Sequence, residues 1–185
     1  MSYYSTQNDE ILKNLMKFYD QDDRLHQMLS IINGESRVSL RIVDWFSTNY
    51  AKKYFTVYSV QRGDDMVRFK VYQDYKLRLK AYSKKRFDPF CRWDRINIPY
   101  KDGSYIQTTI GQLNFFKWAL ENKVIDYINE NYGIIEQDMN SRNSTSKRKN
   151  SPVNKNRTRK KREELSVSAV KSIKKENVEI IVRFD

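Results

Sequence analysis

The sequence predicts an α+β fold with about four to five helices and two β-hairpins, followed by a disordered basic arm and a short C-terminal helix and strand. Apolar residues recur at helical spacing in several segments, two pairs of β-branched and aromatic runs flank glycine turns, and one long segment is basic without any acid. The length of 185 residues allows one folded unit with appendages, and an aromatic share of 14% can supply its core. We therefore expect a folded domain at residues 1–140, a disordered basic linker at residues 141–163, and a short helix with a terminal strand at residues 164–185.

Three helices are expected in the first part of the chain. Asn8 can cap a helix that ends near residue 20, because apolar residues recur at helical spacing behind it. A second helix is expected over residues 22–32, before an Asn-Gly pair that is typical of helix ends. A third begins at Ser36 or Ser39 and is apolar around much of its circumference, which predicts a central place in the core.

Two hairpins follow. Residues 54–60 and 66–72 are β-branched and aromatic runs on either side of a Gly-containing turn. Residues 95–100 and 104–109 flank an Asp-Gly pair, a strong hairpin signal. Pro99 cannot donate a backbone hydrogen bond, so its strand should lie at a sheet edge.

The remaining elements are two helices and a C-terminal pair. Residues 74–86 form a basic helix and residues 111–131 the longest helix, while residues 165–175 are helix-like and residues 178–184 strand-like. The terminal strand either returns to an edge of its own domain or docks on another protein by strand addition. We favour the return, because an exposed apolar strand at a chain end is an aggregation hazard.

Charge is concentrated in the arm. The chain carries 35 Lys and Arg against 23 Asp and Glu, a net charge of +12, and residues 141–162 contain ten of these bases and no acid. Because Val153 is the only aliphatic residue there, burial cannot offset the entropy of ordering the segment, and we expect it to be disordered when free. An extended cationic segment can contact phosphates of DNA or RNA and release counterions. Its two basic clusters also resemble a bipartite nuclear-import signal, and the alternative is a solvated linker that aids solubility.

We expect the nucleic-acid-binding residues in two groups. The arm contributes Lys147, Arg148, Lys149, Lys155, Arg157, Arg159, Lys160, Lys161 and Arg162, and the folded domain contributes Lys76, Lys80, Lys84, Lys85 and Arg86. The second group is interleaved with aromatic residues that could stack on bases, namely Tyr75, Tyr82, Phe87, Phe90 and Trp93. In the alternative interpretation these rings face the core, and only the basic side chains reach solvent.

No pattern of residues indicates an enzyme, although scattered Asp and Glu leave a metal-dependent nuclease open. The chain has 5 glycines and no glycine-rich phosphate loop or nucleophile elbow. With His26 and Cys91 as the only His and Cys, we expect no disulfide framework, no zinc site and no cofactor. The N-terminus lacks a signal-peptide pattern and no long apolar window occurs, so an intracellular location without membrane contact is expected.

Several segments resemble a known family. Residues 41–46, 79–92, 111–119 and 164–184 are similar to an uncharacterised family of small basic proteins from giant double-stranded DNA viruses of protists and algae, of the mimivirus and phycodnavirus kind. The resemblance implies expression in an infected cell, in the host cytoplasm or nucleus or in the virion. It carries over no functional residue.

The leading hypothesis is a non-enzymatic nucleic-acid-binding protein, in which the arm supplies affinity and the basic aromatic surface supplies orientation. The alternative is a virion structural or scaffold protein that docks on a viral protein through residues 178–184. DNA and RNA both stay open as partners.

Overall fold

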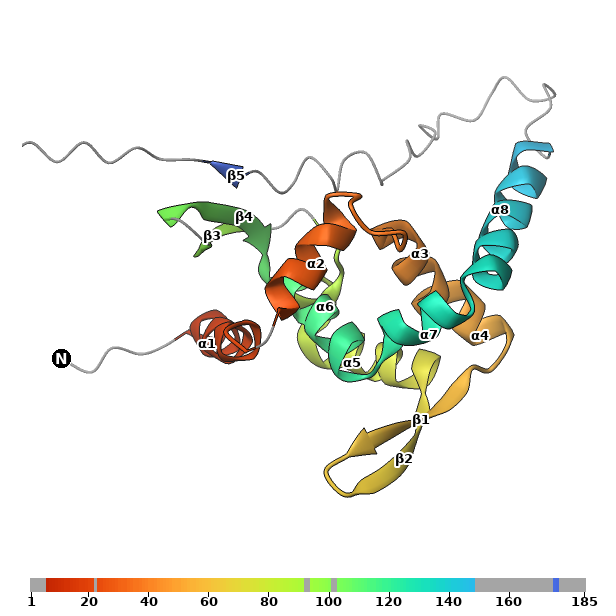
Figure 1. Ribbon diagram of the computed structural model, residues 1–185, viewed down its shortest axis with the longest axis horizontal. Helices are drawn as coiled ribbons and strands as arrows, with labels where there is room; N and C mark the ends of the chain where they lie inside the picture. The colour runs from red at the N-terminus through yellow and green to blue at the C-terminus, as the bar shows by residue number, and fades with distance from the viewer. Residues whose placement is uncertain (1–5, 22, 92–93, 101–102, 149–174, 177–185) are drawn as a thin grey trace, which may run out of the picture.

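A computed structural model describes residues 6–21, 23–91, 94–100, 103–148 and 175–176. Helices gather around the buried helix α6, and two small antiparallel hairpins project from this helical body on different sides (Figure 1). The fold is thus mixed α+β, as expected, with more helices than the four or five predicted.

The first two helices pack at the N-terminal end of the domain. Helix α1 (Gln7–Tyr19) is capped by Thr6 rather than by Asn8. The Thr6 hydroxyl accepts a hydrogen bond from the Asp9 amide at 3.3 Å, and the Asp9 carboxylate accepts one from the Thr6 amide at 2.9 Å, which completes a capping box. Helix α2 (Arg24–Ile32) ends before Gly34, as the sequence indicated.

A continuous helical stretch forms the next part of the core. Helix α3 (Leu40–Trp45) begins after Ser39, whose hydroxyl caps the Ile42 amide as expected, and continues into the π-helix η1 (Phe46–Tyr50) and the short helix α4 (Ala51–Lys53). The Phe46 side chain is fully buried. The stretch therefore occupies the central position that its apolar circumference predicted.

Both predicted hairpins are present. Strands β1 (Val57–Arg62) and β2 (Asp65–Lys70) pair so that a two-residue turn with Gly63 at φ +60° joins them. Strands β3 (Arg95–Pro99) and β4 (Tyr105–Thr109) form the second hairpin.

The second hairpin gains a third strand, β5 (Lys175–Glu176), which pairs with the other side of β4. The sheet order β3-β4-β5 leaves the strand of Pro99 at an edge, as predicted. Lys175 was expected to end a helix and instead belongs to β5. The rest of that expected helix and the expected strand at residues 178–184 lie outside the described residues.

The structure divides the predicted longest helix into α6 (Ile110–Glu121) and α7 (Val124–Glu130). Lys123 adopts a left-handed conformation at φ 56°, and the buried Asn122 lies at the break. The side-chain amide of Asn122 donates a hydrogen bond to the Trp118 backbone carbonyl at 2.7 Å. The backbone carbonyl of Asn122 accepts a hydrogen bond from the Tyr58 hydroxyl at 2.8 Å. Contacts with the first hairpin therefore stabilise a helix break at a position where the sequence has no Gly or Pro.

Helix α8 (Tyr132–Arg148) was not predicted and crosses the boundary expected at residue 140. Its first turns are anchored by Ile135 and Met139, which are buried against the helical body. Once a helix is anchored, each further residue adds a hydrogen bond at little cost, so polar residues can extend it. The backbone of residues 141–148 is therefore helical, where a disordered arm was expected to begin.

Candidate nucleic-acid interface

Helix α5 (Val71–Phe87) carries all five of the basic residues predicted to bind nucleic acid in the folded domain. It contains six Lys or Arg and one acid. Lys76, Lys80, Lys84 and Lys85 are exposed, and we call these four side chains the lysine face. Lys76 and Lys80 are four residues apart and lie on one side of the helix. At Ser83 the backbone leaves helical geometry with φ 65°, which separates this pair from the two later lysines.

The acids nearest to the lysine face do not form ion pairs with its first two lysines, Lys76 and Lys80. Asp74 accepts a hydrogen bond from the Trp118 indole at 2.7 Å and lies 3.6 Å from the Arg78 guanidinium. Asp88 accepts from the Phe90 amide at 2.8 Å and lies 3.6 Å from Lys84. In the described part of the chain no ion pair includes Lys76 or Lys80. Their charge is therefore available to an anionic partner.

Arg86 has a structural role instead. It is half-buried, and its Nε donates to the Asn8 side chain at 2.7 Å. Its carbonyl accepts from the Asn114 side chain at 3.0 Å. Arg86 thus joins α1, α5 and α6, and it contributes less to an outward cationic face than the sequence suggested.

The described aromatic residues interleaved with these bases are buried or half-buried. Tyr75 is 7% exposed and Phe87 is fully buried, with ring centroids 5.8 Å apart. Burial raises the pKa of the Tyr75 hydroxyl, and the nearby Asp44 carboxylate adds to this rise. Tyr82 is half-buried and stacks on Phe87, and Phe90 is also half-buried, while Trp93 lies outside the described residues. The buried rings of α5 cannot stack on bases. For them the alternative interpretation applies, in which the rings face the core and the basic side chains reach solvent.

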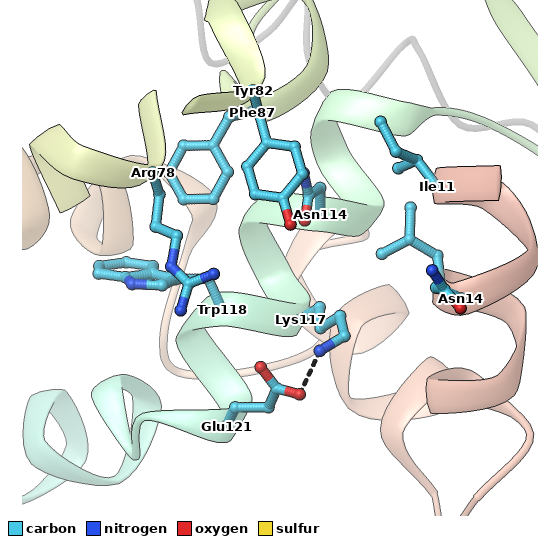
Figure 2. A pocket seen from close by; sticks show the side chains of 10 residues that line it. Ile11, Asn14, Arg78, Tyr82, Phe87, Asn114, Lys117, Trp118 and Glu121 are labelled. Carbon is cyan, nitrogen blue, oxygen red and sulfur yellow. Dashed lines mark hydrogen bonds and ion pairs between the residues drawn. The ribbon is translucent and has the colours of Figure 1, made fainter. Parts of the chain in front are cut away.

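A small cavity lies between α1, α5 and α6, directly beneath these rings (Figure 2). Its lining includes Tyr82, Phe87 and Arg78, and the ion pair between Lys117 and Glu121 lies along one side. The cavity volume is about 80 Å³. Ligand pockets usually measure roughly 300–1,000 Å³, so this cavity is too small for a nucleotide.

A larger pocket opens where α4, the first hairpin and the start of α5 meet. It has a volume of about 520 Å³. We call it the Phe55 pocket, and its lining residues are Ala51, Lys52, Phe55, Thr56, Val57, Lys70, Tyr72 and Gln73. This lining contains two lysines and no acid. The pocket therefore combines apolar and aromatic surface with positive charge.

Two lysines near the Tyr72 ring connect the Phe55 pocket to the lysine face. Lys52 Nζ lies 5.7 Å from the centroid of the Tyr72 ring, and Lys76 Nζ lies 5.8 Å from it. Both distances fall in the range of cation–π attraction. Tyr72, Lys76 and Lys80 follow one another at four-residue spacing on α5. The pocket therefore continues into the first two lysines of the lysine face.

Phe55 was not predicted to be a surface residue, because residues 54–60 were expected to form a strand. The structure ends α4 at Lys53 and starts β1 only at Val57. Phe55 lies in the connection between them, in a left-handed conformation at φ 49°, and is 83% exposed. The one sequence feature that points to this surface is the aromatic pair Tyr54-Phe55 next to two lysines. The alternation of residue types does not show which of these side chains is exposed.

Asp138 of α8 fixes the end of α4 beside this pocket. Its carboxylate accepts hydrogen bonds from the Trp45 indole at 3.1 Å, from Lys53 Nζ at 2.5 Å and from the Tyr54 hydroxyl at 3.1 Å. Burial by itself raises the pKa of Asp138, but these hydrogen bonds outweigh burial and hold the pKa below its usual value. This hydrogen-bond network fixes Lys53 and Tyr54, and with them the position at which the chain leaves α4 and continues to Phe55.

The predicted arm residues lie at and beyond the end of α8. Lys147 and Arg148 are its last two residues. The other predicted arm residues lie outside the described residues, namely Lys149, Lys155, Arg157, Arg159, Lys160, Lys161 and Arg162.

Among the described residues, no three or more His, Cys, Asp or Glu side chains lie close enough together to hold a metal ion. None of the helices described above is long and apolar enough to cross a lipid bilayer.

The fold and this surface define a small mixed α+β protein whose outer face joins exposed lysines to an aromatic pocket. The chain belongs to a family of unknown function, DUF7197, whose family model matches residues 2–169. It is also similar to "Uncharacterized protein L507" of Acanthamoeba polyphaga mimivirus, with 42% identity over 146 residues. That match covers 76% of this chain and 56% of the mimivirus protein, so the chain spans little more than half the length of this relative.

These matches confirm the expected kinship with uncharacterised viral proteins. No solved structure gives a significant match to the chain. The site described above therefore rests on the geometry of this protein alone.

Proposed function

We propose that this protein binds nucleic acid through the phosphate backbone and has no catalytic role. The observation that carries the proposal is the lysine face of α5, where Lys76 and Lys80 point to solvent while the neighbouring acids are engaged elsewhere. Lysine ammonium groups on an exposed helix face contact phosphates and displace condensed counterions, which gives affinity that depends on salt and little on sequence.

The basic arm adds to the same function. Residues 141–162 carry ten Lys or Arg and no acid. Helix α8 leads into this segment, and Lys147 and Arg148 already lie at its end. In this proposal the arm supplies most of the affinity, and its two basic clusters serve nuclear import in the infected cell.

The scaffold alternative receives less support from the described residues. Strand addition to a partner requires a free strand at the C-terminus. The pairing of Lys175 and Glu176 with β4 of the same chain favours the return of this segment to its own domain.

Fluorescence anisotropy of labelled duplex DNA, single-stranded DNA and single-stranded RNA tests the proposal with the full-length protein. We compare the double variant Lys76→Gln/Lys80→Gln with Lys13→Gln/Lys17→Gln. The control also removes two exposed lysines four residues apart on a helix, and so makes the same change in net charge.

The wild type should bind with a steep dependence on salt. Loss of two phosphate contacts should reduce the slope of log K against log salt by about 1.5 in the α5 variant, and the control should keep the wild-type slope. A third variant, with glutamine at the seven basic positions of residues 149–162, should lose most of the affinity. Absence of binding to all three probes at low salt, or equal losses in the two double variants, would overturn the proposal.

A further inference from the structure

The geometry points to the Phe55 pocket as a site for an unpaired nucleobase, so that the domain prefers single-stranded nucleic acid to duplex. This inference rests on the proposed function and adds to it the form of nucleic acid that is bound. It concerns Phe55, Tyr72, Lys52 and Lys70, none of which the sequence singled out as binding residues.

The backbone at Phe55 is the first argument. A left-handed conformation is uncommon for residues other than glycine, and for a bulky side chain it is a true outlier. The φ of 49° at Phe55 nevertheless holds the ring outward, where 83% of the residue is exposed. The ring gains no burial in exchange for this strain. Strained backbone that presents a side chain to solvent is typical of ligand-binding positions.

The composition of the pocket is the second argument. Apolar surface from Ala51 and Val57 lies together with the rings of Phe55 and Tyr72, while Thr56 and Gln73 offer polar atoms. A flat base can stack on an aromatic ring and place its polar edge against such groups. The volume of about 520 Å³ lies within the range of small-molecule pockets.

The positive charge around the pocket is the third argument, because it favours an anionic ligand. Lys52 and Lys70 belong to the lining, which contains no acid, and Lys76 Nζ lies 5.8 Å from the centroid of the Tyr72 ring. Lys80 continues the row about 6 Å further along the helix axis. An aromatic pocket that continues into a row of cations matches a strand whose bases have flat faces that stack on rings and whose backbone is anionic. An uncharged apolar peptide would leave these lysines without a complementary partner.

The preference for single strands follows from the stacking of duplex bases. A base inside a duplex is covered on both faces by its neighbours and can enter a pocket only after unpairing and unstacking, which costs free energy. An unpaired base has its faces available. Duplex DNA should therefore contact the lysine face alone, while a single strand can use the lysine face and the Phe55 pocket together.

The test uses the full-length protein with three variants and three probes of equal length. The variants are Phe55→Gly, which suits the left-handed backbone, the control Tyr105→Ala, which removes another exposed aromatic ring on β4, and Phe55→Trp as a fluorescent reporter. The probes are a single-stranded oligonucleotide, a duplex, and an abasic strand that keeps every phosphate but has no bases.

Phe55→Gly should weaken binding to the single strand about tenfold, as expected for the loss of one stacked base, and leave duplex and abasic binding unchanged. Tyr105→Ala should match the wild type on all probes. In Phe55→Trp the indole fluorescence should be quenched by the single strand and not by the abasic strand.

Each other outcome has a distinct meaning. If the wild type binds the probes but Phe55→Gly loses nothing, or loses equally on the single strand and the abasic strand, the inference is wrong and the proposed function stands. If the wild type binds none of the probes, the proposed function fails and the inference fails with it. Binding of an acidic peptide with the same loss in Phe55→Gly, and none of any oligonucleotide, would assign the pocket to a protein partner instead.

Discussion

Lys53 and Asp138 form an ion pair with an N–O distance of 2.5 Å, which joins the end of α4 to α8. The two ends of this pair differ in environment, since the Asp138 side chain is 6% exposed and the Lys53 side chain 46%. Asp138 also accepts hydrogen bonds from Trp45 and Tyr54. The carboxylate is therefore the buried centre of the network, and Lys53 is its solvent-facing partner.

We expect Asp138→Asn to lower the free energy of unfolding by about 2 kcal/mol, because a buried charged acceptor of three hydrogen bonds is replaced by an amide. The NH₂ group of the new asparagine would also lie against groups that donate hydrogen bonds to Asp138, so it would have no acceptor there. Urea denaturation followed by circular dichroism measures the change. Lys53→Met is the matched control and should lose clearly less, since the lysine is half exposed. Equal losses in the two variants would contradict the assignment of Asp138 as the centre.

Asp44 should make stability fall as the pH rises. Burial raises the pKa of its carboxyl to about 7, and the like charge of Asp88 adds to the rise. Between the unfolded pKa near ~4 and the folded value, the native state binds a proton that the unfolded state has lost, so the folded form is progressively destabilised over this window.

Asp44→Asn removes this titration. The stability of the variant relative to the wild type should therefore increase between pH 4 and pH 8, by about 2 to 4 kcal/mol at 1.36 kcal/mol per unit. Urea midpoints for both proteins at several pH values provide the measurement. A constant difference across the range would show that Asp44 does not titrate in this window.

Gly111 allows α6 to approach the end of α5. A Cβ at this position would lie 2.8 Å from the Asp88 carbonyl oxygen and 3.2 Å from that of Lys85. Gly111→Ala should therefore destabilise the protein by about 1 to 3 kcal/mol, although alanine favours helices. Gly133→Ala is the control, because it lies in α8 with no atom within 4 Å of the added Cβ. This control should gain up to about 1 kcal/mol, and thermal unfolding of both variants decides the comparison.

Phe55→Gly should fold at least as stably as the wild type. The left-handed backbone costs about 1–2 kcal/mol for an L-residue, which offsets the entropy that glycine adds to the unfolded chain. A melting temperature equal to or above the wild-type value is expected in differential scanning calorimetry. A clear drop would mean that the exposed ring stabilises the domain.

Part of the proposed binding surface follows from the sequence. The basic character of α5 and the lysine face formed by Lys76, Lys80, Lys84 and Lys85 were predicted, and the four side chains are exposed. Two of the rings that were considered for base stacking are not exposed. Tyr75 and Phe87 are buried, while Phe55, which was assigned to a strand, is 83% exposed. A ring and a lysine in alternation do not indicate which of them faces the core, since that depends on the elements packed against the helix.

What the sequence determined by itself is the local structure that neighbouring residues create. The Gly63 and Asp-Gly turns define both hairpins, Ser39 caps α3, Gly34 follows α2, and Pro99 places β3 at an edge. Each of these signals acts through backbone conformation or a hydrogen bond within a few residues, so it can be identified without knowledge of the rest of the chain.

Only the tertiary structure decided the break at Asn122, the length of α8 and the place of Phe55. Asn122 bonds to Tyr58, 64 residues away, and Asp138 of α8 bonds to Lys53, 85 residues away. Such partners meet only when the chain folds, and their hydrogen bonds outweigh the local preference for a continuous helix or strand. The Phe55 pocket is a product of these distant contacts, because they fix where α4 ends and where the hairpin begins.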